Sequence, residues 1–219
     1  MSYNDSSQQK PGEHLIISAV EKLQRAVQDA AAMHSQLATA CFAELTAIAE
    51  VSANSLRNGG KLFFCGNGGS AAECQHLSTE FVVRLSAHRD RQALAAIALT
   101  TDTSLLTACS NDYGFDRVFS RQIEALASKV DVVFLLSTSG RSQNLILAAQ
   151  TAQAIGAKCV GFLGSGATPL DRHLDHALRI PSSSGQRVQE AHLLCGHMLV
   201  ELIEDLLLSR PEDNLRHSR

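Results

Sequence analysis

The chain has 219 residues, of which 45% are apolar and 19% are charged, and its formal net charge is −3. This apolar share supports a substantial core and excludes a strongly charged, disordered chain. The basic residues are scattered rather than gathered into blocks, which excludes a nucleic-acid-binding surface of the usual kind and favours small polar partners. The length suits one α/β domain with added helices.

The sequence also bears on the compartment of the protein. The N-terminal stretch MSYNDSSQQKPGEH lacks the apolar core of a signal peptide, and charged residues interrupt the apolar run over 192–208. The cysteines form no C-x-x-C pair and mostly have apolar neighbours, as reduced core thiols do: Cys41, Cys65, Cys74, Cys109, Cys159 and Cys195. We therefore expect a cytoplasmic protein with no membrane partner.

The first 58 residues divide into a polar arm and a long helical pattern. Residues 1–12 are polar and end in the breaker Pro11-Gly12, so we expect a flexible arm. Over 13–58, apolar residues recur at spacings of three and four, which predicts two helices broken near 31–35. Such a hairpin buries its apolar surface most easily against a second copy of itself, so the pattern predicts an oligomer. We expect one domain over 13–219 that includes the hairpin.

After Gly59-Gly60, short apolar runs alternate with helical stretches. The predicted strands are 62–65, 93–99, 130–137, 158–163 and 176–180, and the predicted helices between and after them are 71–86, 115–128, 142–155 and 186–208. Continuous apolar strands with intervening helices are typical of a parallel sheet covered on both faces. The polar residues that follow the strands should then converge on one cleft at the carboxyl edge of the sheet.

Residues 66–70, Gly-Asn-Gly-Gly-Ser, form a glycine-rich turn between a predicted strand and a predicted helix. Such a turn can bind an anion at the helix N-terminus. It also fits the dinucleotide fingerprint, in which an acidic residue about 20 positions further on binds the ribose. Asp102 is too distant for that role and Asp90 falls in a charged loop, so nicotinamide binding is the weaker alternative.

A second polar loop follows the third predicted strand. It supplies four hydroxyl side chains beside a glycine, at Ser137, Thr138, Ser139 and Ser142. Hydroxyls, free backbone N–H groups and the positive end of a helix together suit a phosphate group. The alternative is a helix N-cap with spare serines, because serine and threonine favour helix starts in any case. The number of hydroxyls favours phosphate binding.

The helix after the glycine turn carries His76 and Glu80 four residues apart, and therefore on one face. Alone they could be a solvated surface pair, but the last helix adds Gln189 and His197, and zinc binds histidine nitrogen and carboxylate oxygen. Gln189 and His197 are eight residues apart, about 12 Å along a continuous helix. Both reach one metal only if Gln189 lies in an irregular first turn or the side chains lean together. His192 is then a supporting or structural residue.

Four stretches of the chain carry a family resemblance: CGNGGSAAECQHLSTEF, SNDYGFDRVFSRQIEAL, LLSTSGRSQNLILAA and VQEAHLLCGHMLVELIE. In order and spacing they resemble the bacterial phosphoheptose isomerases of the sugar isomerase (SIS) superfamily, over about residues 15–208. The resemblance implies a three-layer, flavodoxin-like α/β fold with a five-stranded parallel sheet. It also implies a homotetramer built around a helical bundle, with active sites at subunit contacts.

The resemblance implies a role for each candidate residue. The substrate phosphate would be bound by Ser137, Thr138, Ser139 and Ser142. The sugar site would be formed by Asn67, Gly68, Gly69, Glu80, Asn111, Asp112 and Gln189. One zinc ion per subunit would be bound by His76, Glu80, Gln189 and His197. Glu80 and His197 would be the catalytic pair that transfers the proton.

The implied activity is that of an aldose–ketose isomerase in lipopolysaccharide heptose synthesis. It would convert sedoheptulose 7-phosphate to D-glycero-D-manno-heptose 7-phosphate through an enediol. Arg141 stands where the family has asparagine, and Gln186 where a relative has aspartate, so recognition of the sugar chain is expected to differ. The alternative is a non-catalytic SIS-fold protein that binds a DNA replication initiator. That group lacks the carboxylate and the last histidine, so Glu80 and His197 favour an enzyme.

Overall fold

The computed structural model describes residues 11–208, with side chains from Ser18 onward. Residues 1–10 of the expected arm lie outside the described residues. The first helix, α1, begins at Pro11, so Pro11-Gly12 starts this helix instead of breaking the chain before it. Proline is tolerated in the first turn of a helix, because the N–H that it lacks would have no intrahelical acceptor there.

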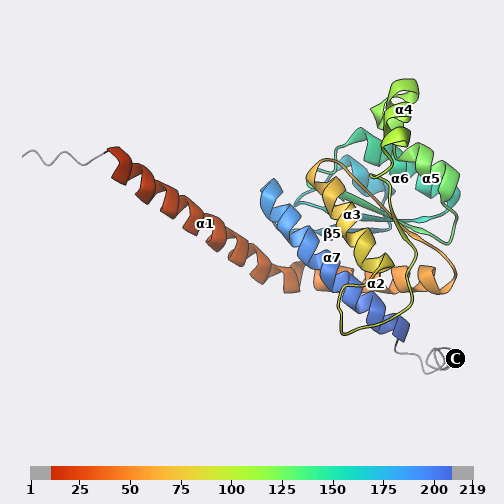
Figure 1. Cartoon of the computed structure of the whole chain (residues 1–219), viewed down its shortest axis with the longest axis horizontal. Helices are drawn as coiled ribbons and strands as arrows, with labels where there is room; N and C mark the ends of the chain where they lie inside the picture. The colour runs from red at the N-terminus through yellow and green to blue at the C-terminus, as the bar shows by residue number, and fades with distance from the viewer. Residues whose placement is uncertain (1–10, 209–219) are drawn as a thin grey trace, which may run out of the picture.

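Two helices, α1 (Pro11–Ala40) and α2 (Phe42–Arg57), precede the sheet. They meet at Cys41, so the break predicted near 31–35 was wrong. The segment 31–35 contains no glycine or proline and its Met33 is buried, so the helix continues through it. Figure 1 shows α1 running away from the body while α2 lies across it, so the two helices do not fold back on one another as the predicted hairpin would.

Five strands form one parallel sheet in the order β2-β1-β3-β4-β5. They are β1 (Leu62–Gly66), β2 (Ala96–Ala98), β3 (Val132–Ser137), β4 (Lys158–Leu163) and β5 (His176–Arg179), and all five predicted strands are confirmed. Every adjacent pair is parallel. Strands β1 and β3 are buried along their whole length, which explains why they read as unbroken apolar runs rather than as alternating ones.

The remaining helices follow the strands along the chain. They are α3 (Gly69–Val82), α4 (Thr103–Tyr113), the 3-10 turn η1 (Phe115–Arg117), α5 (Ser120–Leu126), α6 (Gln143–Ile155), the 3-10 turn η2 (Pro169–His173) and α7 (Gly185–Leu208). The helix predicted over 115–128 is therefore a 3-10 turn followed by the shorter α5. Within residues 11–208, no helix combines the length and apolar character needed to span a membrane.

Helices cover both faces of the sheet (Figure 1), which confirms the three-layer α/β architecture. On one face α2, α3 and α7 contribute to a core that includes Phe64 and Phe134. On the other face α5 and α6 contribute to a core that includes Phe63 and Val133. Neighbouring residues of one strand therefore serve opposite cores, as the alternation of side chains along a strand requires.

Helix α4 was not predicted. Asp102 is its N-cap, and its carboxylate accepts a hydrogen bond from the backbone N–H of Leu105 over 2.9 Å. Cys109 is buried and Leu105 and Leu106 pack, partly buried, against the core, so the apolar stripe of this helix is short. Capping by Asp102 and this short apolar face together support the helix.

The register of the sheet places the polar turns at one edge. Gly66, the last residue of β1, pairs with Leu136 of β3, and Ser137 of β3 pairs with Leu163 of β4. The strands therefore end at nearly the same level. The loops that follow β1, β3 and β4 leave the sheet at the edge where ligands bind in open parallel sheets.

Candidate functional site

The glycine turn links β1 to α3 and lies beside the start of α6. Gly68 has a φ of +57°, which favours glycine. The side-chain amides of Asn67 and Asn144 donate hydrogen bonds to each other's oxygens, each over 2.9 Å. Asn144 is buried in the first turn of α6, so this pair joins the glycine turn to the start of α6.

The hydroxyl loop, residues 137–142, connects β3 to α6. Ser142 occupies the N-cap position of α6, as the alternative interpretation expected, but its side chain makes no capping hydrogen bond and so is free for a ligand. The Ser137 hydroxyl accepts a hydrogen bond from the Gly140 N–H over 3.0 Å. Ser139 is exposed and Thr138 is partly buried. The loop therefore presents hydroxyls at the N-terminus of a helix, where an anion is favoured.

Three potential metal ligands come together from two helices. His76 and Glu80 lie on α3, and His197 lies on α7. The Nε2 atoms of the two histidines are 2.8 Å apart, and the His76 Nε2 is 3.5 Å from the Glu80 Oε1. One donor atom from each residue lies within 4.8 Å of the others. His76 and Glu80 are therefore not an isolated surface pair.

This donor set fits a divalent metal ion. Two imidazole nitrogens and one carboxylate oxygen are donors that zinc binds in proteins, and a site with three protein ligands leaves a position for substrate. The three side chains range from exposed to partly buried, so an ion and a small molecule can reach them. The chemistry of the residues thus permits the zinc that the resemblance implies.

Helices α3 and α7 can approach closely because α7 has a glycine where they meet. A Cβ atom on Gly196 would lie 2.5 Å from the Leu77 side chain. At the other end of the contact, the Gln189 amide nitrogen occupies the space that a Cβ atom on Gly69 would need. Gln189 thus contacts the start of α3, about two turns before His76.

Asn111 and Asp112 lie in α4, which projects from the body of the molecule in Figure 1. Both are exposed, and the Asn111 amide donates a hydrogen bond to the Asp112 carboxylate over 2.8 Å. Asp112 is not among the three clustered donors. Arg141 is exposed, and Gln186 accepts a hydrogen bond from the Ser184 hydroxyl over 3.1 Å.

His192 belongs to the core rather than to the cluster. Its side chain is buried and its ring centroid is 5.7 Å from that of Phe162. Burial lowers the pKa of His192 to about 4, so the ring is neutral at neutral pH. The interpretation of His192 as a structural residue fits this position.

Sequence reasoning missed Glu73, which precedes His76 by three residues on α3 and shares its face. Burial raises the pKa of Glu73 to about 7, and a hydrogen bond with Ser70 opposes the shift in part. The Oε2 atom is buried without a hydrogen-bond partner among the described residues. The spacing of residues 73, 76 and 80 was the signal that could have identified it.

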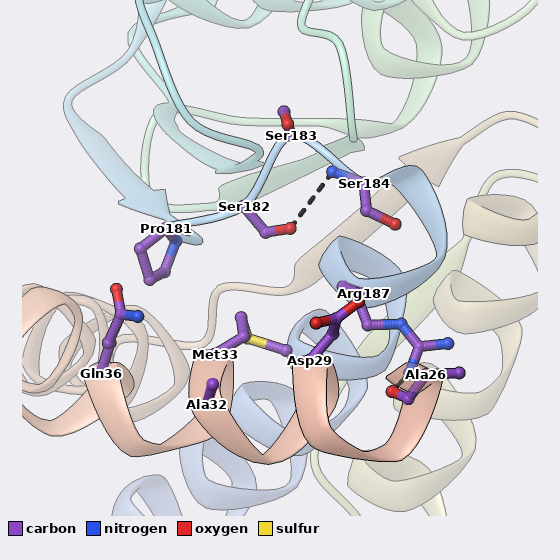
Figure 2. Close-up of a pocket in the computed structure, with 10 residues that line it drawn as sticks. All are labelled: Ala26, Asp29, Ala32, Met33, Gln36, Pro181, Ser182, Ser183, Ser184 and Arg187. Carbon is purple, nitrogen blue, oxygen red and sulfur yellow. Dashed lines mark hydrogen bonds between the residues drawn. The ribbon is translucent and has the colours of Figure 1, made fainter. Parts of the chain in front are cut away.

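A separate cavity of about 420 Å³ lies between α1 and the segment 181–187 (Figure 2). The Arg187 guanidinium points across it and donates a hydrogen bond to the Ala26 carbonyl over 2.9 Å. No predicted site residue lines this cavity. It marks where α1 is attached to the start of α7.

Comparisons with known proteins agree on one family. The model of the SIS domain family matches residues 27–164. The phosphoheptose isomerase of Roseiflexus sp. (strain RS-1) is 49% identical over 74% of this chain and 82% of its own length. That of Chlorobaculum parvum is 47% identical over 74% of this chain and 78% of its own length.

Solved structures give the same result. A phosphoheptose isomerase from Francisella tularensis superposes with a TM-score of 0.82 at 30% identity, over 85% of this chain and 98% of that one. The phosphoheptose isomerase of Neisseria gonorrhoeae superposes with a TM-score of 0.80 at 35% identity, over 85% of this chain and 99% of that one.

Proposed function

The chain belongs to the phosphoheptose isomerase family of SIS-domain proteins, and from this premise we propose how its site isomerises a sugar phosphate. The substrate is sedoheptulose 7-phosphate, the product is D-glycero-D-manno-heptose 7-phosphate, and the reaction is an aldose–ketose isomerisation. The observation that carries the mechanism is the meeting of His76, Glu80 and His197, with one donor atom from each within 4.8 Å of the others.

Isomerisation moves a proton between two neighbouring carbons through an enediol. It needs a base at carbon, an acid at the neighbouring oxygen and a means to stabilise the developing negative charge. The Glu80 carboxylate takes the proton from C1 of the ketose and returns it to C2. The His197 imidazole moves the proton between the two oxygens. The contacts of both side chains with the His76 Nε2 atom support this division of roles.

The same residues are proposed to hold a zinc ion, one per subunit. His76, Glu80 and His197 would bind it, with Gln189 as the fourth donor after its amide leaves Gly69. The bound ion would act as a Lewis acid that polarises the substrate carbonyl. A carboxylate is a weaker base while it is bound to a metal, so Glu80 is expected to alternate between ligand and base.

The phosphate group is proposed to bind at the start of α6. The hydroxyls of Ser137, Thr138, Ser139 and Ser142 and the helix N-terminus would hold it. The turn residues Asn67, Gly68 and Gly69 would form the wall of the sugar site, and Asn111 and Asp112 would complete it. The Asn67–Asn144 pair supports this arrangement, since it joins the glycine turn to the first turn of α6.

We propose that the protein works as a cytoplasmic homotetramer that supplies heptose for lipopolysaccharide. The exposed apolar residues of α1 support an oligomer, because Val20, Leu23 and Val27 are 47%, 68% and 69% exposed in the single chain. Residues of α4 would then complete an active site at a subunit contact. The replication-initiator alternative has no support, because the relatives from Roseiflexus, Chlorobaculum and Francisella carry the isomerase name.

The decisive experiment is incubation of metal-replete protein with sedoheptulose 7-phosphate in D₂O. We expect an aldose 7-phosphate that carries solvent deuterium at C2. We expect Glu80→Gln to lower kcat by about 10²- to 10⁴-fold, as the loss of a general base does, while calorimetry shows retained sugar-phosphate binding. Glu201→Gln, at an exposed position of α7, is the matched control with normal turnover. Undiminished turnover in Glu80→Gln would contradict the assignment.

A further inference from the structure

A buried arginine holds the end of the helix that carries His76 and Glu80. Arg91 follows α3 in the chain, and its side chain is 3% exposed. Its Nη2 donates a hydrogen bond to the Glu80 carbonyl over 2.8 Å, and its Nη1 to the Phe81 carbonyl over 2.9 Å. Because α3 ends at Val82, these carbonyls belong to its last turn and have no partner within the helix. The positive charge also suits the C-terminal end of a helix.

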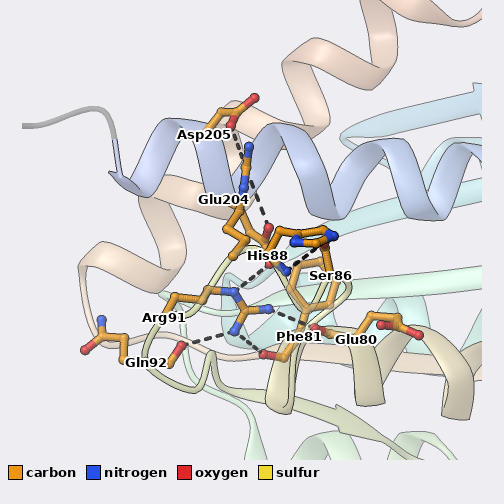
Figure 3. Close-up of polar contacts among 9 residues, drawn as sticks. Glu80, Phe81, Ser86, His88, Arg91, Gln92, Glu204 and Asp205 are labelled. Atoms are coloured by element: carbon orange, nitrogen blue, oxygen red, sulfur yellow. Dashed lines mark hydrogen bonds and ion pairs between the residues drawn. The ribbon is translucent and has the colours of Figure 1, made fainter.

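The same guanidinium contacts α7, which supplies the third donor of the cluster. The Arg91 Nε is 2.6 Å from the Glu204 Oε1, and the Glu204 side chain is 2% exposed. Glu204 follows His197 by seven residues, or nearly two full turns, so the two side chains project from one face of α7. Figure 3 shows Arg91 between this helix and the Glu80 and Phe81 backbone.

Arg91 therefore binds both helices of the cluster with one rigid group. The Gly196–Leu77 approach sets how close α3 and α7 come, but a contact between apolar groups has no fixed direction. The planar guanidinium adds directional contacts between the two helices. Its N–H groups point in set directions, to Glu204 on α7 and to the Glu80 and Phe81 carbonyls on α3. A buried ion pair adds little net stability, because desolvation of the two charges offsets their attraction. Stability alone therefore does not explain the Arg91–Glu204 pair.

We propose that Arg91, with Glu204, is a positioning residue that sets the distance between His197 and the pair His76 and Glu80. The inference rests on the proposed function, because positioning matters only if these side chains act together. Arg91 touches neither substrate nor metal in this scheme. It acts through the backbone of Glu80 and through the α7 face that carries His197.

The test separates positioning from folding with the double variant Arg91→Met/Glu204→Met. It leaves no buried charge without a partner, so its Tm should remain near that of the wild type. The hydrogen bonds to the α3 carbonyls are lost, however. We expect kcat and the affinity for Co²⁺, followed by its absorption spectrum, to fall by about 10- to 100-fold, as for other supporting contacts of metal sites. KM should stay unchanged, because the hydroxyl loop is untouched.

Two single variants complete the experiment. Arg91→Lys keeps the charge beside Glu204 but loses the planar fork, so we expect a normal Tm with reduced kcat and Co²⁺ affinity. Arg89→Met is the matched control, because Arg89 contacts Glu204 and Asp205 on the solvent side and makes no described contact with α3. It should behave as the wild type.

The proposal is overturned if the double variant folds and keeps wild-type kcat and Co²⁺ affinity. If the double variant does not fold, wild-type values of both quantities in Arg91→Lys overturn it. Failure of Arg91→Lys to fold would also overturn it, since Arg91 would then serve the fold as a whole. A wild-type protein that binds Co²⁺ but isomerises no sugar phosphate would contradict the proposed function instead. The Co²⁺ spectra of the variants would still report the positions of the three donors.

Discussion

Glu73 is a carboxyl group whose protonation the fold controls. It lies on the face of α3 that bears His76 and Glu80, and burial raises its pKa to about 7 from an ordinary value of 4.5. The folded protein therefore holds more protons than the unfolded chain between about pH 4.5 and 7. The stability associated with this group is fully present below that range and is lost as the pH rises through it.

Replacing Glu73 should show this dependence directly. Glu73→Gln removes the ionisable group, so we expect little change in the free energy of unfolding at pH 5 and a gain of roughly 1–2 kcal/mol at pH 8, after allowance for solvent screening. Urea denaturation at both pH values measures it. Glu50→Gln, at an exposed position of α2, is the control and should change neither value. An equal effect of Glu73→Gln at the two pH values would contradict burial of an ionisable carboxyl as the cause.

Individual site residues could be predicted where local geometry defines them. His76 and Glu80 share a face because of the helix period alone, and this holds in α3. The approach of His197 could only be expected from its residue type, because it depends on how α7 packs beside α3. The contact of Gln189 with Gly69 was not predictable at all. It depends on how far α7 is shifted along its axis relative to α3, and these two helices are distant in sequence.

At the scale of the elements, the sequence predicted what burial patterns encode. Strands β1 and β3 were recognisable because both of their faces are covered. Helix α4 was missed because its capping residue, Asp102, is a weak signal beside a segment with little buried surface. The end of α1 at Cys41 could not be located either, since no glycine or proline marks it.

The contact between α3 and α7 makes a prediction at this scale. Gly196→Ala places a methyl group 2.5 Å from Leu77, so the helices must separate. We expect a loss of about 1–3 kcal/mol in the free energy of unfolding, together with weaker metal binding, because His197 is the next residue. Chemical denaturation and metal titration measure the two effects. Gly185→Ala adds its methyl group in open space at the start of α7 and is the matched control.

A stable Gly196→Ala variant with normal metal affinity would show that α3 and α7 tolerate a wider spacing. It would then be wrong to treat this glycine as the reason that the three donors meet. The Arg91 variants address the same interface from its other end. Effects of the two sets should not be additive, because both change the distance between one pair of helices.

At the scale of the whole molecule, the single chain has an exposed apolar element. Helix α1 extends from the body in Figure 1, and its residues Val20, Leu23 and Val27 are exposed. A helix gains little stability in water without an apolar partner for such residues. The chain therefore has a surface that a second copy could cover, and the proposed tetramer would bury it.

Charged substitutions on α1 test this arrangement. Leu23 and Val27 are 68% and 69% exposed, so Leu23→Glu/Val27→Glu should leave the fold of the single chain intact. In the oligomer the same side chains would be buried and their charges desolvated, which is costly. We expect analytical ultracentrifugation to show a shift from tetramer toward smaller species, with loss of turnover if subunit contacts complete the site.

The control for α1 is Gln24→Glu/Gln28→Glu, which adds the same two charges at polar positions of the same helix. It should leave the sedimentation and the turnover unchanged. A wild-type protein that sediments as a monomer at micromolar concentration would contradict the oligomer itself. A monomeric but fully active Leu23→Glu/Val27→Glu variant would instead separate the two proposals, because Asn111 and Asp112 would then have to reach the site within one chain.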